Sequence, residues 1–136
     1  LGLREPSPAL SFGIDIGASP AAVIVVSILM VLASSAFGVM LASMVDSVRT
    51  ASSAAVLASL SMAALGGSWW PLFIAPDWQQ QIAKVTPHAW ANTAFNKLLL
   101  FGAEGSEVVL EMAALSLFTV AFMAIAIAKF RTAPTS

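Results

Sequence analysis

Very few side chains in this sequence are of the kinds that carry out covalent or metal chemistry. His88 is the single histidine, and there is no cysteine. A metal site in a protein takes three or four ligands, and His88 has no second histidine or thiolate to join it. The sequence also has no HExxH motif and no constellation that indicates a Ser-His-Asp triad. We therefore expect no catalytic residue, metal site or cofactor in this chain, and a capping or interfacial role for His88.

A few charged side chains lie within or beside apolar stretches, where they would bind ions or protons. Glu104, Glu107 and Glu111 are spaced i, i+3 and i+7, so they share one face at the start of a predicted helix, where the helix dipole favours anions. Glu107 and Glu111 are either solvated at the membrane surface or part of a relay for protons or cationic substrates. Lys97 either extends its ammonium to water or contacts anionic substrates or lipid head groups.

The composition indicates a membrane protein. Of the 136 residues, 59% are hydrophobic and 10% are charged, whereas ordinary soluble domains are about 25% charged. The mean hydropathy is +0.90, and a soluble fold this short could not bury so much apolar surface. The net charge of −1 offers no footprint for nucleic acid. Because the chain begins at Leu1 and shows no leader, we expect a piece of a longer protein.

Three long apolar runs predict an all-α integral membrane fold. About 20 apolar residues cross the hydrocarbon core of a bilayer, and the predicted spans are residues 20–45, 51–70 and 107–129. Ser19 and Pro20 suit the N-cap and the first position of the first helix. The segments left over are an outer loop, 1–19, a cytoplasmic turn, 46–50, an outer hairpin, 71–106, and a cytoplasmic tail, 130–136.

The positions of the basic residues predict which side of the membrane each of these segments faces. Lysine and arginine prefer the cytoplasmic side, close to the ends of spans. One side of the membrane holds Arg49, Lys129 and Arg131 within two short segments, and the other holds the remaining three over much longer ones. Six of the seven acidic residues also lie on that second side. We therefore expect a multi-pass protein of the cell membrane with a cytoplasmic C-terminus.

Small side chains recur every four residues in the first two spans. This spacing places them on one face of a helix, and helices in lipid associate through the close backbone approach that small residues allow. The predicted helix-packing seam consists of Ser34, Gly38 and Ala42 in the first span, and of Ala51, Ala55, Ser59, Ala63 and Gly67 in the second.

The stretch after the second span is too polar to continue it and too apolar for a solvated loop. Glycines 66 and 67 and Pro71 end the span, and Trp69 and Trp70 stand at the depth that indoles prefer. A short helix is expected next, with Asp77 as its N-cap. Its apolar stripe consists of Trp78, Ile82 and Val85.

A second short helix completes the predicted hairpin. Thr86 suits its N-cap and Pro87 its first position, and the helix runs from about His88 to Phe101 before Gly102. It carries Trp90, the last of the four tryptophans. Two short helices, each with one apolar side, predict an amphipathic element that lies in, or dips into, the outer leaflet.

These motifs together resemble the C-terminal part of the permeases of ABC type-2 exporters. The residues that carry the resemblance are Gly66-Gly67, Pro71-Leu72-Phe73, Pro76-Asp77-Trp78 and Thr86-Pro87-His88-Ala89-Trp90. The likeness covers roughly residues 21–131. It implies the last three spans of a six-span permease, with the hairpin as the extracellular re-entrant element. The residues assigned to this outer gate are Trp69, Trp70, Pro71, Asp77, Trp78, Thr86, Pro87, His88 and Trp90.

The resemblance also implies partners. The family pairs two permease copies, as a homodimer or heterodimer within membrane lipid, with two ABC ATPase subunits. No G-x-x-x-x-G-K-[ST] motif occurs here, so ATP and Mg²⁺ are expected on the partner ATPase. The family's first three spans and its main cytoplasmic coupling helix are missing. Asp46 and Arg49, at i and i+3, are either an ion pair in a tight turn or a contact to the ATPase.

We therefore predict a permease subunit of an ABC exporter that forms part of the translocation path and the outer gate. The alternative is a small, non-transporting structural or assembly membrane protein. An intramembrane enzyme is disfavoured by the missing catalytic constellations. No charge pattern distinguishes a drug, lipid, polysaccharide or ion as the substrate.

Overall fold

The computed structural model describes residues 19–132, so nearly all of the predicted loop 1–19 and the end of the tail, 133–136, lie outside the described residues. Five α-helices follow one another: α1 (Pro20–Met44), α2 (Val48–Leu65), α3 (Asp77–Ala83), α4 (Pro87–Leu99) and α5 (Val109–Thr132). Two 3-10 turns, η2 (Leu72–Ile74) and η3 (Gly105–Val108), precede α3 and α5. Three segments are long and apolar enough to cross a membrane, namely Pro20–Met44, Val48–Leu65 and Gly105–Phe130. The all-α membrane fold is thus confirmed.

The second helix differs from the predicted span in its bounds. It begins at Val48, three residues before the predicted start, because the Oγ of Ser47 accepts a hydrogen bond from the Thr50 amide at 3.1 Å and caps it. It ends at Leu65, and Gly67 follows with a φ of +86°, a conformation that glycine adopts without strain. Trp69 and Trp70 therefore follow the helix rather than belonging to it. The turn is shorter than predicted, since Arg49 and Thr50 are already helical.

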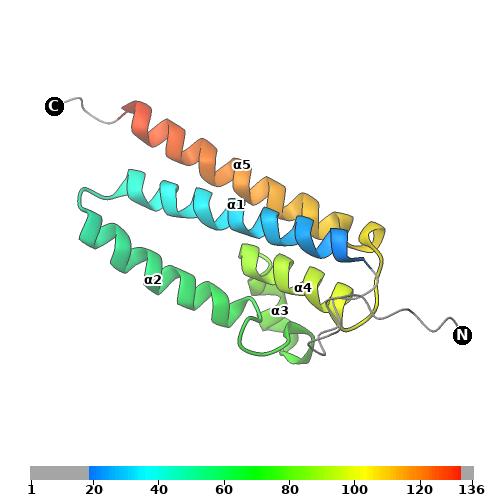
Figure 1. The fold of residues 1–136 in the computed structure, drawn as a ribbon. Helices are drawn as coiled ribbons and strands as arrows, with labels where there is room; N and C mark the ends of the chain where they lie inside the picture. The colour runs from blue at the N-terminus through cyan, green and yellow to red at the C-terminus, as the bar shows by residue number, and fades with distance from the viewer. Residues whose placement is uncertain (1–18, 133–136) are drawn as a thin grey trace, which may run out of the picture.

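The long helices α1 and α5 lie side by side along most of their length, with α2 on the other side of α1 (Figure 1). Val26, Ala33 and Ala36 of α1 and Leu115 and Ala126 of α5 are almost fully buried. Phe37 of α1 meets Phe122 of α5, with ring centroids 5.2 Å apart. Small and apolar side chains thus form the seam between the first and last spans.

This seam differs from the one predicted in α1, whose packing against another chain stays a prediction. Ser34, Gly38 and Ala42 are exposed, and the face of α1 that packs on α5 is rotated away from them. The four-residue spacing identified small side chains correctly, but the larger contact area lay on the face that carries Val26, Ala33 and Ala36. In α2 no residue is buried, and Ser59 is exposed. Within residues 19–132 the predicted ladder of α2 therefore makes no closely packed interface, and its use outside this chain stays a prediction.

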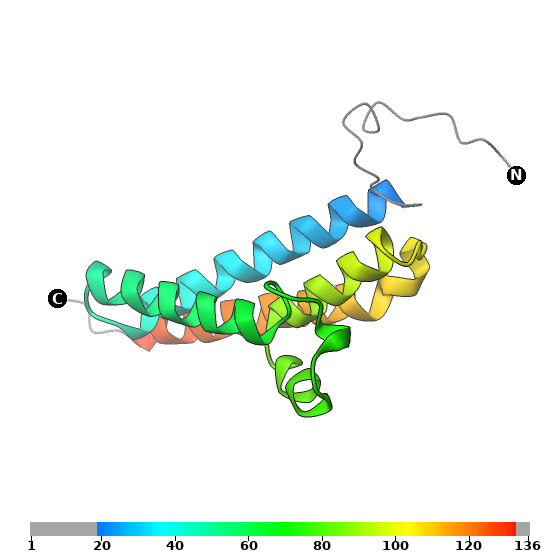
Figure 2. The same ribbon diagram turned by 90° about the horizontal axis from the view of Figure 1, so that it is seen from below.

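The hairpin, defined here as α3, α4 and the corner between them (residues 77–99), lies at the end of the bundle opposite to the turn between α1 and α2 (Figure 1). Helix α4 lies along the long helices, whereas α3 projects away from them (Figure 2). The main apolar core is shared by three helices there: Ala22 and Val26 of α1, Ala91, Ala94 and Leu98 of α4, and Leu115 of α5, with Val108 of η3. The hairpin is thus part of the folded core.

Candidate functional site

The corner at Thr86 and Pro87 is closed and buried. Thr86 caps α4 as predicted, because its Oγ1 accepts a hydrogen bond from the Ala89 amide at 3.3 Å. The same hydroxyl donates to the Ala83 carbonyl at 2.8 Å, at the end of α3. Across the corner, the indole Nε1 of Trp90 donates to the Lys84 carbonyl at 2.8 Å. These bonds join α3 to α4 at the bend formed by Thr86 and Pro87.

The first hairpin helix departs from its predicted cap. Asp77 is the first helical residue, and Pro76 occupies the N-cap without a side-chain hydrogen bond. Asp77 still lies in the first turn, where the helix dipole stabilises a negative charge. The predicted apolar stripe is present, but it faces outward: Trp78 is 62% exposed, and Ile82 and Val85 are exposed as well. The inward face instead buries Gln79 and Ala83, which leaves the stripe for lipid or a partner.

The aromatic pair before the hairpin is also exposed. The rings of Trp69 and Trp70 meet edge to face, with centroids 6.2 Å apart, and both side chains face outward. Pro71 is the N-cap of η2, whose Leu72 is buried. Together with Trp78, these tryptophans present apolar rings with polar N–H groups, which suits the interface between lipid and water.

Asn92 ties the hairpin to the end of α2. Its Nδ2 donates to the Gly66 carbonyl at 3.0 Å and to the Oγ of Ser68 at 2.8 Å. Gly66 allows this close approach, because a Cβ at that position would lie 2.5 Å from the His88 Cβ and 2.8 Å from the Ala89 nitrogen. The glycine that ends α2 is therefore also the residue against which the start of α4 packs.

Lys97 ties the hairpin to α5. Its Nζ lies 2.5 Å from the Oε1 of Glu111, and the two side chains are 39% and 3% exposed respectively. Glu111 also lies in the first turn of α5, where the helix dipole favours its charge. Glu111 therefore does not have the solvated role weighed from the sequence, whereas Lys97 pairs with it and stays partly exposed. Glu104 and Glu107 do remain exposed, and the Glu107 Oε2 accepts from the Glu104 amide at 2.7 Å.

His88 lies in the first turn of α4, and its imidazole is partly buried. Thr86 supplies the cap, so of the two roles expected for His88 the capping one is wrong, and the interfacial one stays a prediction. Among the described residues the His88 Nδ1 has no hydrogen-bond partner. Burial lowers the pKa of His88 below its ordinary value of 6.5, because desolvation disfavours the charged imidazolium. No group of three or more His, Cys, Asp or Glu residues that could hold a metal ion occurs within residues 19–132.

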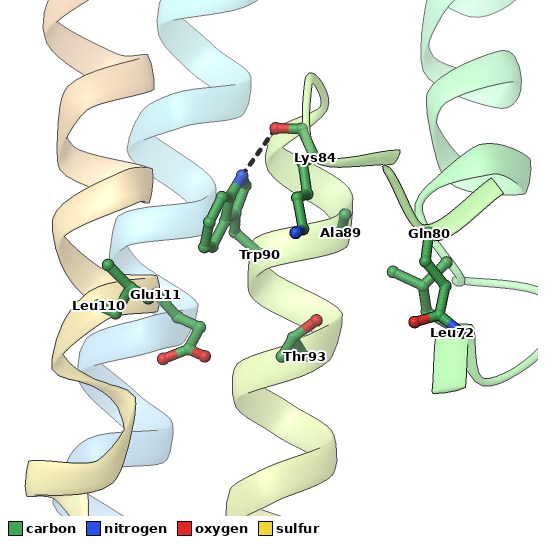
Figure 3. Close-up of a pocket in the computed structure, with 8 residues that line it drawn as sticks. All are labelled: Leu72, Gln80, Lys84, Ala89, Trp90, Thr93, Leu110 and Glu111. Carbon is green, nitrogen blue, oxygen red and sulfur yellow. Dashed lines mark hydrogen bonds between the residues drawn. The ribbon is translucent and has the colours of Figure 1, made fainter. Parts of the chain in front are cut away.

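A cavity of about 280 Å³ lies between the hairpin and α5 (Figure 3). The residues that line it are Leu72, Gln80, Lys84, Ala89, Trp90, Thr93, Leu110 and Glu111. A second cavity, of about 270 Å³, shares Leu72, Gln80 and Thr93 and extends toward Phe73 and Phe101. The hairpin therefore leaves space beside the last span and supplies polar groups to it.

The turn between α1 and α2 is at the other end of the molecule. Asp46 and Arg49 are exposed and form no ion pair with each other within the described part of the chain. The first of the two alternatives for these residues is therefore wrong. Their side chains are free for an external contact, which stays a prediction.

Comparison with known proteins identifies the family of this chain. Residues 7–128 match the family model described as "ABC-2 family transporter protein". The chain belongs to this family. The resemblance to the ABC type-2 transporter family that the sequence motifs indicated is thus confirmed. The chain is 33% identical over 101 residues to the linearmycin resistance permease protein LnrN of Bacillus subtilis (strain 168).

That match covers 72% of this chain and 25% of LnrN, so the chain spans about a quarter of the length of its relative. No solved structure matches the chain. Within the permease, the sequence motifs located the corner at Thr86 and the hairpin. They missed the roles of Asn92 and Lys97, although the single charges Lys97 and Glu111 on neighbouring apolar helices were a sign that the two could pair.

Proposed function

We propose that this chain forms the last three spans of a six-span permease in an ABC exporter, and that its hairpin controls the outer exit. In this proposal a separate ABC ATPase binds ATP and Mg²⁺, and a second permease copy completes the path. The permease lies in the cell membrane with the α1–α2 turn and the C-terminus in the cytoplasm. A non-transporting structural protein is the weaker alternative, since the chain belongs to a transporter family.

The observation that carries this proposal is the position of α4. This helix contacts α1, α2 and α5, all at one end of the bundle. Any relative movement of the spans would therefore displace the hairpin. Because the corner at Thr86 is closed by several hydrogen bonds, α3 and α4 would move together as one body.

The contacts divide into a firm set and a set that can be exchanged. The α1–α5 seam is apolar and extends along both helices. The hairpin shares an apolar core with both of these helices. Helix α2, in contrast, buries no residue, and its end is tied to the hairpin by the hydrogen bonds of Asn92. Water can replace such bonds at an outer surface with little net loss. We infer that α1 and α5 act as the scaffold, and that the end of α2 and the hairpin move relative to each other.

The end of the molecule away from the hairpin suits a contact to the ATPase. Asp46, Arg49 and the start of α2 are exposed there. A push on this turn would reach the hairpin through α2, whose last turn holds Asn92 by way of Gly66. Nucleotide-driven closure of the ATPase subunits would thus move the outer exit.

A disulfide lock tests the proposal. The chain has no cysteine, and the Ser68 Oγ lies 2.8 Å from the Asn92 Nδ2, so S68C/N92C places a cysteine pair between the end of α2 and the hairpin. In the intact permease with its ATPase, we expect oxidation to stop export, and a reductant to restore it, while the complex stays assembled. Export that continues at full rate after complete oxidation would exclude the hairpin as the gate.

The matched control joins helices of the scaffold. F37C/F122C pairs residues of α1 and α5 whose rings are in contact, and its oxidation should leave export largely intact. The single variants S68C and N92C control for the loss of the Asn92 bond. The relative is named for linearmycin resistance, so survival of cells in linearmycin is the first readout of export to use.

The orientation has its own test. Gln81 is exposed on α3, and a cysteine placed there by Gln81→Cys should react with a membrane-impermeant maleimide added to intact cells. Reaction only after the cells are opened would place the hairpin in the cytoplasm and would overturn the gate proposal.

A further inference from the structure

The cavity between the hairpin and α5 joins an apolar wall to a set of polar side chains (Figure 3). Leu72, Ala89, Leu110 and the ring of Trp90 form the apolar part. The polar part consists of Gln80, Lys84, Thr93 and Glu111. At about 280 Å³ it has the size of a site for a small head group.

Glu111 contributes an acceptor that has no donor. Its Oε1 is bound by Lys97, but its Oε2 is buried and has no hydrogen-bond partner among the described residues. A buried acceptor left unpaired is unfavourable, because it has lost its hydrogen bonds to water. The terminal torsion of a glutamate is broad, so a small rotation can turn Oε2 toward the cavity while Lys97 keeps its contact. A donor that enters the cavity would remove this cost.

The charges around the cavity disfavour a cationic donor. Lys97 already balances the charge of Glu111, and Lys84 adds a second positive charge to the cavity wall. A cationic ligand would therefore meet an excess of positive charge. A hydroxyl group can donate to the Glu111 Oε2 and also accept from Lys84 or Thr93, so it satisfies both kinds of group at once.

Trp90 adds a flat surface to this site. Its indole N–H is already bound to the Lys84 carbonyl, so the ring face is what it offers to a ligand. The negative face of an indole attracts C–H groups with partial positive charge, such as those of a polyol or sugar ring. Leu110 is 67% exposed beside the cavity, which gives an apolar chain a route from the site into lipid.

We propose that this cavity binds the head group of a neutral, polyhydroxylated amphiphile whose apolar chain extends into the membrane along α5. The inference concerns binding alone. If the permease binds such an amphiphile but exports nothing, this inference about binding still holds, whereas the gate proposal fails.

The test uses the intact permease in lipid nanodiscs and an alkyl glucoside that carries a diazirine close to its head group. After illumination, mass spectrometry of peptides locates the label. We expect label in the segments that hold Trp90, Thr93 and Leu110. Octyl glucoside should compete for labelling, whereas octyl tetraethylene glycol and octyltrimethylammonium, with the same chain but one hydroxyl or a cationic head, should not.

Two variants keep the inference falsifiable. Thr93→Phe fills the cavity, and Glu111→Gln alters the acceptor at nearly the same volume. Each should lower labelling about fivefold or more, the equivalent of one lost hydrogen bond. Glu107→Gln, an exposed carboxylate on the same segment that does not line this cavity, should leave labelling within about twofold. Thermal unfolding shows whether each variant is folded. If one of Thr93→Phe and Glu111→Gln does not fold, the other serves as the test.

Three results would overturn the inference. The first is label spread over the exposed helices in proportion to their exposure. The second is equal competition by all three amphiphiles, which would mean an apolar groove without head-group recognition. The third is unchanged labelling in folded Thr93→Phe or Glu111→Gln.

Discussion

Lys97 and Glu111 form an ion pair between the hairpin and the last span, with 2.5 Å between Nζ and Oε1. The two residues differ in exposure, since the carboxylate is nearly fully buried and the ammonium reaches the surface. Removing Lys97 alone therefore differs from removing both residues. Loss of Lys97 leaves a buried charge without compensation, whereas loss of both leaves none.

This asymmetry gives the first prediction. Lys97→Met should lower the free energy of unfolding by about 2 kcal/mol, less than for a fully buried pair because Lys97 is partly solvated. The double variant Lys97→Met/Glu111→Leu should recover much of that loss, because two apolar side chains replace the pair. Thermal unfolding of the four proteins of this double-mutant cycle in detergent measures both effects. A double variant less stable than Lys97→Met would contradict the prediction.

Two glycines provide a matched pair for the second prediction. Gly66→Ala should destabilise the permease by about 1–3 kcal/mol, because the added Cβ would lie 2.5 Å from the His88 Cβ. Gly38→Ala should stabilise it by roughly 0.5–1 kcal/mol, because Gly38 lies inside a helix and a Cβ there meets nothing within 4 Å. Melting temperatures in detergent should move in opposite directions. If the two melting temperatures fell equally, the close packing of α4 against Gly66 would be contradicted.

The third prediction concerns Asn92, which donates to both Gly66 and Ser68. Asn92→Leu should loosen the end of α2 and cost about 1–2 kcal/mol. Hydrogen exchange in nanodiscs should then speed up for the amides of residues 66–70. Asn96→Leu is the control, because the Asn96 side chain forms no hydrogen bond within the described chain. Equal exchange in the two variants would show that the Asn92 bonds do not hold this segment.

The fourth prediction follows from the lowered pKa of His88, which is caused by burial. Above an ordinary pKa of about 6.5 the imidazole is neutral in the folded and the unfolded state, so its contribution to stability is fully present. As the pH falls below that value, the unfolded state binds the proton first, and stability decreases until the folded-state pKa is passed. The melting temperature should therefore decrease between about pH 7.5 and pH 5.5.

The control for this effect is His88→Gln, which keeps a polar side chain without a titrating group. Its melting temperature should change less over the same pH range. A decrease as large as that of the unchanged protein would assign the pH dependence to groups other than His88.

The sequence was sufficient for the spans, the hairpin and the corner, because these depend on local patterns. Uncharged runs of about 20 residues identify spans, and Thr86 followed by Pro87 identifies a helix start. The packing face of α1 could not be found in this way. Spacing shows which small residues share a face, but only the position of α5 decides which face is covered. The pairing of Lys97 with Glu111 likewise needed the fold of the loop between α4 and α5.

The seam between α1 and α5 also constrains how the protein is made. Its two halves lie at opposite ends of the described chain, and about 65 residues separate Met44 from Val109. At roughly 5–20 residues per second, a ribosome needs several seconds to cover that distance. Throughout this interval the first span is in the bilayer without its main partner, and α2 cannot replace it, because α2 buries no residue. The order of the helices therefore leaves the face of α1 that carries Val26, Ala33 and Ala36 without α5 until the last span has been made.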